Sequence, residues 1–427
     1  MKLAVIGGGS SYTPELIDGL FSRLDRIPVT EVWLMDPNLD RLEITAGLAE
    51  RMSQKHGIPF TVHATDDLRA AVQDASYVVT QLRVGGIQAR IQDEKLGLKY
   101  GIIGQETTGV GGFACALRTI PRILDIAHTM QEVAPKGFLI NFTNPSGIVT
   151  EALIKHGGVR CVGLCNVPIG IIMDIAKFMQ CSPQDVQLDY VGLNHLSWVQ
   201  DVRIAGKSVF DDVLNQFLEH ADEEWEHEPT REAMVLAMRT LHMICNGYLQ
   251  YFYATEEAFA RLSSREKTRG EEIIEIERSL FEKYAQKDLT SKPEELSKRG
   301  GAHYSTAAFM VIDAIENNTQ DRQIVCCRNS GAVPTFDADV SLEVPALIDR
   351  MGATAISQPA PPPAIRGLMQ QMKAYETLTV EAAVRGDRKA ALEALLLHPL
   401  LPGIRKAKDI FDELLAINRP HLQGTFF

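Results

Sequence analysis

Cys165 and His195 are residue types that bind transition metals, and they stand thirty positions apart in this chain of 427 residues. Cys165 follows an apolar run typical of a strand, and His195 ends the segment Gly192–His195. A thiolate and an imidazole together suit a transition metal. Two protein ligands leave positions open for substrate oxygens and water, as a catalytic metal requires. The spacing also fits a cysteine that is only a small buried hydrophobic residue, so the metal pair is a hypothesis.

A run of aromatic residues provides a second group of candidates. Tyr248, Tyr251 and Tyr253 lie within six residues. Their side chains could line a pocket, but their spacing is also typical of the packed face of an amphipathic helix. The spacing leaves both interpretations open.

A glycine-rich turn near the start of the chain is typical of a dinucleotide site. Three consecutive glycines follow a predicted strand and precede a predicted helix, which is a variant of the dinucleotide fingerprint. Gly7 permits the tight turn, and Gly9 lets the backbone approach a pyrophosphate at the helix N-terminus. Ser10 and Ser11 add hydroxyl donors. The last glycine of the usual fingerprint is absent, because Tyr12 stands there.

Asp36 strengthens the dinucleotide interpretation. It ends the second predicted strand, 29 residues after Gly7. A carboxylate at that place binds the ribose hydroxyls of adenosine and favours NAD over NADP. The alternative is a tight turn in a flavodoxin-like protein that binds no dinucleotide.

The elements that must position these residues alternate over the first 165 residues. Several of the strand-like runs are continuously apolar, as expected of parallel strands covered on both faces. Alternating strands and helices indicate βαβ units and a doubly wound parallel sheet. The predicted strands are Leu3–Gly7, Glu31–Asp36, Phe60–Ala64, Tyr77–Leu82, Phe138–Asn141 and Val159–Leu164, and the predicted helices lie near Pro14–Leu24, Arg41–His56 and Thr119–Val133.

The second part of the chain has a different pattern. Residues 211–290 are rich in charge and in helix signals, and Gln323–Cys327 is strand-like. Gln358–Ala364, with three consecutive prolines, is a rigid connector, and two or three helices follow from Ile365. We therefore predict an α/β protein with a Rossmann-like NAD-binding domain over residues 1–165. Residues 166–427 would form a helix-rich α+β domain that binds substrate and metal and mediates oligomerisation.

Composition excludes several classes of function. The net charge is −12, which argues against non-specific nucleic-acid binding. No stretch approaches the ~18 apolar residues of a membrane span, and the short apolar N-terminus breaks into glycine rather than forming a signal sequence. The seven cysteines are odd in number and lack a disulfide framework. A cytoplasmic protein with reduced thiols is therefore expected.

Taken together, these segments resemble glycoside hydrolase family four, the NAD- and metal-dependent glycosidases. The resemblance covers nearly the whole chain, and the motifs occur in the family's order. The similar segments are Gly7–Leu16, Gly104–Gly112, Asn141–Gly147, Cys165–Pro168, Gly192–His195 and Tyr248–Tyr251.

The resemblance implies a role for each matching residue. Cys165 and His195 would ligate Mn²⁺ or another divalent metal, and Tyr248 would be the catalytic base. Asn144 would contact sugar hydroxyls beside the nicotinamide. Arg90 and Arg269 would bind the sugar 6-phosphate. Glu106 would lie near the metal and the sugar, and Arg83 is a weaker candidate for the pocket.

Two positions bear on which branch of the family this chain resembles. Members that act on α-linked phosphoglucosides carry an Asp after the metal-binding Cys, whereas this chain has Asn166. Together with Gly104–Gly112, Asn166 is similar to the 6-phospho-β-glucosidase branch. Gly247 departs from relatives that have proline before the tyrosine.

The chemistry that this resemblance implies is redox-neutral. NAD takes a hydride from C3 of the sugar, the base removes the acidified C2 proton, the aglycone leaves C1, water adds, and the hydride returns. Such NAD-dependent glycosidases are exceptions to the usual mechanism, in which a pair of carboxylates flanks the bond that is cleaved. The expected substrate is a small phosphorylated β-glucoside, and the expected assembly is a homodimer or homotetramer.

Three alternatives remain. A 2-hydroxy-acid dehydrogenase would use the same dinucleotide platform but would leave Cys165 without a role. A protein that only senses NAD or a sugar phosphate would not need Cys165, His195 and Tyr248 together. A family-four glycosidase could also act on another glycoside, including an unphosphorylated one.

Overall fold

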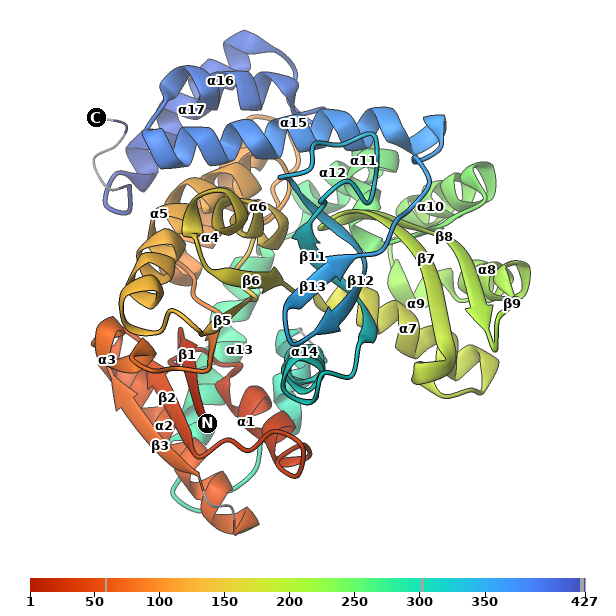
Figure 1. Cartoon of the computed structure of the whole chain (residues 1–427). Helices are drawn as coiled ribbons and strands as arrows, with labels where there is room; N and C mark the ends of the chain where they lie inside the picture. Colours follow the sequence, from red (N-terminus) through yellow and green to blue (C-terminus); the bar gives the residue numbers. More distant parts are fainter. Residues whose placement is uncertain (58–59, 301–302, 423–425, 427) are drawn as a thin grey trace.

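A single twisted sheet runs through the computed structural model, with helices on both faces (Figure 1). The structure describes residues 1–57, 60–300, 303–422 and 426. In this part of the chain the order of the hydrogen-bonded strands is β10-β8-β7-β12-β11-β6-β5-β4-β1-β2-β3, and β9 and β13 pair with β8 and β12.

The N-terminal half of the sheet is parallel and has the strand order 3-2-1-4-5-6. This is the order of a doubly wound dinucleotide-binding fold, so the predicted fold class is confirmed. All residues of β4 and β5 are buried, as a parallel strand covered on both faces requires. The strands are β1 (Lys2–Ile6), β2 (Glu31–Met35), β3 (Thr61–Thr65), β4 (Tyr77–Thr80), β5 (Phe138–Asn141) and β6 (Arg160–Gly163).

The helices of this half include one that is longer than expected. The predicted helix over Thr119–Val133 is only the C-terminal part of α5 (Gly109–Val133). The glycines at its start have low helix propensity, but apolar residues such as Phe113 and Leu117 bury this first part. The other helices of this half are α1 (Thr13–Phe21), α2 (Leu39–His56), α3 (Leu68–Val72), α4 (Gly86–Lys99) and α6 (Ser146–Ala152).

The C-terminal half extends the same sheet with antiparallel strands. The predicted strand Gln323–Cys327 is the centre of β11 (Asp321–Arg328), which meets β6 where Cys326 pairs with Gly163. The sheet therefore crosses the predicted domain boundary near residue 165, and that boundary stays a prediction. The remaining strands are β7 (Val186–Leu193), β8 (Leu196–Ile204), β9 (Lys207–Ser208), β10 (Ile244–Cys245), β12 (Ser341–Asp349) and β13 (Gly352–Ala355).

Helices surround this extension of the sheet. After the proline-rich connector, α15 (Pro363–Arg385), α16 (Arg388–Leu397) and α17 (Ile404–Asn418) form the three-helix tail, with α15 packed on α5 and α6 (Figure 1). No described helix has the length and apolar character to cross a membrane. The others are α7 (Asn166–Met179), α8 (Phe210–Glu219), α9 (Ala221–Glu224), α10 (Glu228–Leu241), α11 (Gln250–Tyr253), α12 (Thr255–Ser264), α13 (Arg269–Tyr284) and α14 (Tyr304–Asn317).

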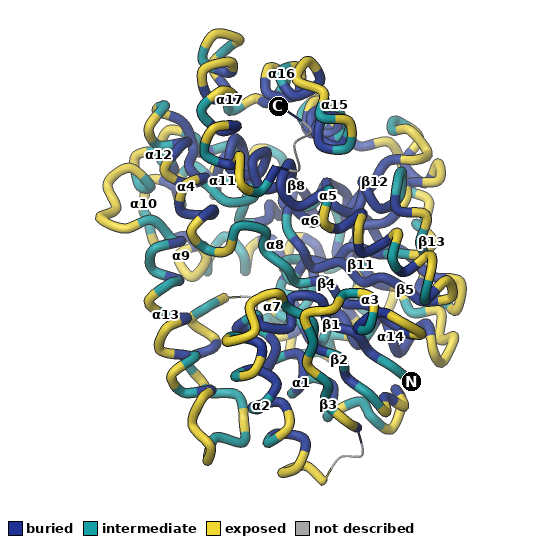
Figure 2. The backbone as a smooth tube through the Cα atoms, turned by 90° about the vertical axis from the view of Figure 1, so that its left-hand side faces the viewer, coloured by how far each residue is buried: buried dark blue, intermediate teal, exposed yellow. Residues whose placement is uncertain are grey.

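The core follows the sheet. Buried residues concentrate along the strands and the inner faces of α5 and α15. Along α2 and α13, buried residues alternate with exposed ones (Figure 2). All seven cysteines are free.

The β7–β8 hairpin ends in a two-residue turn formed by Asn194 and His195. His195 has φ +65°, a left-handed conformation that is uncommon for residues other than glycine and that often marks a functional site. Gly192 sits at the base of this turn, where an added Cβ would overlap the backbone and side chain of Ser197. Glycine at this position lets the two strands close and fixes the place of His195.

We expect Gly192→Ala to lower the free energy of unfolding by about 1–3 kcal/mol, because the new methyl group must displace backbone in a packed hairpin. Thermal unfolding followed by circular dichroism measures this. Gly367→Ala is the matched control, since Gly367 lies within α15 and its Cβ would have no neighbour within 4 Å. The control should be neutral or up to about 1 kcal/mol more stable, and equal melting temperatures for both variants would contradict the packing argument.

Candidate active site

A cavity of about 740 Å³ lies over the carboxyl ends of the parallel strands, where this fold binds its ligands. It is large enough for a dinucleotide. Several residues predicted to bind the cofactor line it, namely Gly7, Gly9, Ser10, Asp36 and Asn144.

The glycine turn has the geometry that a pyrophosphate needs. Gly7 has φ +95°, and a Cβ there would lie 2.8 Å from the backbone of Gln81, so other residues are excluded. The backbone N–H of Gly9 donates to Asp36 Oδ2 at 3.0 Å. Because Asp36 lies at the cavity wall, it can accept from ribose hydroxyls, and its charge would repel a 2′-phosphate. The residues present fit NAD.

Ser11 does not line this cavity. Its side chain is fully buried, and its hydroxyl donates to Glu277 Oε1 at 2.9 Å. Glu277, on α13, also accepts from Arg41 at 3.0 Å and from Arg299 at 3.1 Å. The hydroxyl of Ser11 therefore fastens the glycine turn to the C-terminal half of the chain.

A second cavity of about 730 Å³ adjoins the first. The two share the lining residues Tyr12, Arg83, Asn144, Arg299 and Tyr304. Asn144 thus lies between them, as expected of a residue that contacts both the sugar and the nicotinamide. The second cavity also collects most of the remaining predicted residues, namely Arg90, Glu106, Asn166, His195, Tyr248 and Arg269.

A cluster of arginines occupies one side of the second cavity. Glu106 bridges Arg83 at 2.7 Å and Arg90 at 3.1 Å. Burial alone would raise the pKa of Glu106, but the charges of Arg83, Arg90 and Arg299 outweigh it and hold that pKa at about 2. Glu106 is therefore ionised at neutral pH and orients the guanidinium groups.

Arg269 joins this cluster through the start of α13. Glu94 accepts from Arg90 Nε at 2.8 Å and from the backbone N–H of Gly270 at 2.8 Å, which brings the two predicted arginines to one wall. Thr268 caps the helix in a reciprocal bond with Glu271. Arg269 itself contacts Glu272 at 2.9 Å and keeps a partly exposed guanidinium.

Cys165 and His195 meet at the edge of the cavity. Cys165 Sγ lies 3.5 Å from His195 Nε2, although the two residues come from the start of α7 and from the hairpin turn. The turn is held by Glu343, a buried carboxylate on β12 that accepts from Asn194 at 3.0 Å and from Tyr190 at 2.6 Å. The structure thus brings the predicted metal pair together.

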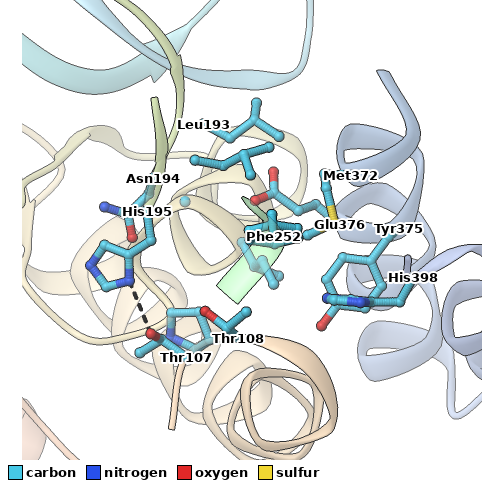
Figure 3. A pocket seen from close by; sticks show the side chains of 14 residues that line it. Thr107, Thr108, Leu193, Asn194, His195, Phe252, Met372, Tyr375, Glu376 and His398 are labelled. Carbon is cyan, nitrogen blue, oxygen red and sulfur yellow. Dashed lines mark hydrogen bonds between the residues drawn. The ribbon is translucent and has the colours of Figure 1, made fainter. Parts of the chain in front are cut away.

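The proton on His195 can be assigned from its neighbours. The hydroxyl of Thr107 donates its only proton to Gln105 Oε1 at 2.9 Å, so it must accept from His195 Nδ1 at 2.9 Å (Figure 3). His195 Nε2 is then the unprotonated nitrogen, facing Cys165. Burial lowers the pKa of His195 to about 4, against the opposing effect of Glu106, so the ring is neutral, as a metal ligand must be.

The donor set fits a metal ion that shares its coordination with a ligand. In the described ranges, no group of three or more His, Cys, Asp and Glu side chains could hold a metal ion. Burial, with the charge of Glu343, raises the pKa of Cys165 to about 12, and a bound cation would reverse this and stabilise the thiolate. Cys165 and His195 would therefore supply two ligands and leave the rest to substrate and water.

Tyr248 lies directly on this pair. Its ring stacks on His195, with 3.6 Å between centroids and 5° between planes. Its backbone N–H donates to Asn246 Oδ1 at 2.9 Å within a 3₁₀ turn, Gly247–Leu249. Burial, followed by the charges of Cys165 and Glu106, raises the pKa of Tyr248 well above 10, so only a nearby cation could make it a base at neutral pH.

Of the other two tyrosines in this run, one lines the cavity and one packs away from it. Tyr251 lines the cavity and packs in a small apolar cluster with Ile103 and Ala258. Tyr253 packs near Trp198 and is not a lining residue of the cavity.

Some residues at the site had no role in the sequence interpretation. Arg299 reaches both cavities and lies 4.9 Å over the ring of Tyr12, but nothing in its local sequence marks it. Thr107 had a signal, since it belongs to the family-like segment Gly104–Gly112.

A dinucleotide-type sheet that opens onto a polar cavity with a Cys–His pair and clustered arginines is typical of enzymes of the Rossmann class. Models of the two domains of family 4 glycosyl hydrolases match residues 2–181 and 190–401. The chain belongs to this family.

Relatives of this chain include 6-phospho-β-glucosidases. A probable 6-phospho-β-glucosidase of Bacillus subtilis is 41% identical over 100% of this chain and 98% of its own. The structure of the 6-phospho-β-glucosidase of Thermotoga maritima with manganese, NAD⁺ and glucose 6-phosphate is 37% identical, with a TM-score of 0.91 and 99% of each chain covered. A 6-phospho-α-glucosidase of Leptotrichia buccalis is only 28% identical over 98% of each chain.

The fold has a wider likeness. The malate dehydrogenase of Cryptosporidium parvum superposes with a TM-score of 0.55 over 90% of this chain and 98% of its own, at 13% identity. This shows the dinucleotide-binding fold alone.

Thr107→Val is expected to weaken Mn²⁺ binding about 10- to 100-fold, because it removes the acceptor that orients His195 and fixes its tautomer. Titration of the Mn²⁺ electron paramagnetic resonance signal measures this without turnover. Thr107→Ser keeps the hydroxyl and should bind nearly as well as the unmodified protein, and NAD⁺ affinity should not change in either variant. Unaltered Mn²⁺ affinity in Thr107→Val would show that Thr107 does not act through His195.

Proposed function

We propose that this chain is a cytoplasmic 6-phospho-β-glucosidase that depends on NAD⁺ and Mn²⁺ or a similar divalent metal. The observation that carries the proposal is that His195 contacts both Cys165 and Tyr248 at a cavity that opens onto the dinucleotide site. The arginines of the same cavity supply the second requirement, a site for a phosphorylated sugar.

The two cofactors supply chemistry that the side chains lack. Bound NAD⁺ would accept a hydride from C3 of the sugar, and the metal ion would stabilise the negative charge that develops on the C2–C3 oxygens. The structure of the Thermotoga maritima 6-phospho-β-glucosidase determined with manganese, NAD⁺ and glucose 6-phosphate supports both cofactors. Asp36 and the glycine turn would hold the dinucleotide, and Cys165 and His195 the metal.

The phosphate would be bound away from the reacting carbons. Arg90 and Arg269 lie on one wall, joined by Glu94, and Arg83 and Arg299 lie toward the dinucleotide. A guanidinium donates two parallel hydrogen bonds to a phosphate, so this cluster suits a dianion. Binding there would fix the ring so that C2 faces Tyr248.

Tyr248 would remove the C2 proton. Its ring stacks on His195, and a cation bound by the metal pair would lower the pKa of Tyr248. Asn144, at the junction of the cavities, would hold a sugar hydroxyl at the nicotinamide.

The β-linked substrate follows from the relatives and from Asn166. The three 6-phospho-β-glucosidases are 38–41% identical to this chain, against 26–28% for the α-linked and maltose-6′-phosphate enzymes. Asn166 lines the cavity where the α-branch has an acid. We further expect the homodimer or homotetramer implied by the family.

Hydrolysis of p-nitrophenyl β-glucoside 6-phosphate tests the proposal under reducing conditions, with NAD⁺ and Mn²⁺ each added or withheld. We expect nitrophenol only when both are present, with no lasting NADH, because the hydride returns to C3. Net NADH production from malate or lactate without metal would instead support a dehydrogenase. Release of nitrophenol from unphosphorylated p-nitrophenyl β-glucoside at the same rate would show that the arginines do not select a phosphorylated sugar.

Tyr248→Phe should reduce turnover by roughly 10²- to 10⁴-fold, the usual contribution of a general base. It should also abolish exchange of the C2 hydrogen with deuterium from solvent, read by NMR of the recovered substrate. NAD⁺ and Mn²⁺ affinities serve as controls for folding. Surviving exchange would place the base elsewhere, and Tyr251 would be examined next.

A further inference from the structure

One wall of the second cavity has no role in the proposed reaction so far. It is formed by α7, by the end of α8 and by α9. Phe178 packs edge-on against Phe217, with 5.6 Å between centroids, and stacks on His220 at 5.1 Å. Trp225 and Glu224 complete this surface, which we call the aromatic wall. Such a surface suits a flat or ring-shaped group.

The place of the aromatic wall identifies what would face it. The other sides of the second cavity are occupied: Arg90 and Arg269 form one, and Asn144 marks the side that opens onto the dinucleotide cavity. Tyr248 would face C2, and C1 is the next carbon of the ring. The substituent on C1 is therefore the part of the substrate that is left to meet this wall.

Glu224 lies directly against the turn that carries Tyr248. A Cβ added to Gly247 would overlap Glu224 Oε1. Within the described residues, the side chain of Glu224 has no hydrogen bond or ion pair and is open to the cavity. The missing side chain of Gly247 thus leaves space for this carboxyl group.

Two further observations fit a ligand at this wall. Glu224 is exposed by its accessible surface, but the cavity walls partly desolvate its carboxyl group. This desolvation, with the nearby charge of Asp174, raises the pKa of Glu224 to about 7. The indole N–H of Trp225 is buried and finds no acceptor in the part of the chain that the structure describes. A buried donor without an acceptor is unfavourable, and an aglycone hydroxyl would reach it only after the side chains that cover this nitrogen move.

The reaction itself requires a proton at this place. When the C1–O bond breaks, its electron pair goes to the aglycone oxygen. A sugar or alkyl alkoxide is a poor leaving group unless it is protonated as it departs. Asn166, the residue that lines this part of the cavity at the start of α7, has no acidic proton to give.

We propose that Glu224 donates this proton to the glycosidic oxygen while the aromatic wall holds a ring-shaped aglycone, a sugar or an aryl group. The inference rests on the proposed function. After oxidation at C3 by NAD⁺ and removal of the C2 proton, C3=O re-forms, C1=C2 forms and C1–O breaks. The oxygen takes the proton of Glu224 and leaves as the alcohol. The Glu224 carboxylate then takes a proton from the water that adds to C1.

The test compares leaving groups of different acidity on the full-length enzyme with NAD⁺ and Mn²⁺. The substrates are the p-nitrophenyl and methyl β-glucoside 6-phosphates. Glu224→Gln should keep kcat within about threefold for the nitrophenyl substrate, because nitrophenolate leaves without a proton. It should lose roughly 10²-fold or more for the methyl substrate. Exchange of the C2 hydrogen in recovered methyl substrate should persist, because deprotonation does not need Glu224.

Gly247→Ala provides a second variant, since its methyl group would displace the flexible end of Glu224. It should show the same selective loss. Glu226→Gln removes an exposed carboxyl group that does not line the cavity, and should keep the ratio of the two rates unchanged. Equal losses for both substrates in Glu224→Gln, or no loss for either, would overturn the assignment. An unmodified enzyme inactive on both substrates would overturn the proposed function and the inference with it.

Discussion

The site depends on how the tip of the β7–β8 hairpin is held against the end of β6. Cys165 follows β6 directly, and His195 reaches it only because β11 and β12 lie between the two and continue the sheet. Glu343 fixes the tip through Asn194 and Tyr190. A buried carboxylate is stable only when such donors satisfy it, so β12 and the hairpin are bound to each other as a unit. The left-handed backbone of His195 is maintained by this arrangement.

The second constraint is the balance of charge in the cavity. Each arginine of the cluster already contacts an acidic residue: Arg83 and Arg90 contact Glu106, Arg299 contacts Glu277 and Arg269 contacts Glu272. These carboxylates allow several guanidinium groups to lie close together, because each carboxylate offsets part of the repulsion between them. Guanidinium groups have five donors, so they can add a phosphate without first losing these partners.

Sequence patterns predicted the parallel half of the fold. Most of the predicted site residues line the two cavities, and their roles stay predictions. The six predicted runs became β1–β6, and the clearest signal came from β4 and β5, whose residues are all buried, as in parallel strands covered on both faces. The β7–β8 hairpin was not predicted, although Val186, Leu188 and Tyr190 alternate with polar residues, a usable strand signal. Arg299 and the Ser11–Glu277 bond could not be predicted. They join residues far apart in sequence, and only tertiary packing decides such pairs.

The bond from Ser11 to Glu277 also joins the two cavities, because Glu277 accepts from Arg299, which lines both. A ligand that moves Arg299 on one side therefore acts on the glycine turn on the other. Such coupling is reciprocal for binding free energies. Any factor by which the dinucleotide tightens the sugar phosphate must equal the factor by which the sugar phosphate tightens the dinucleotide. Where that factor exceeds one, the dinucleotide would be held more firmly while the sugar phosphate is bound.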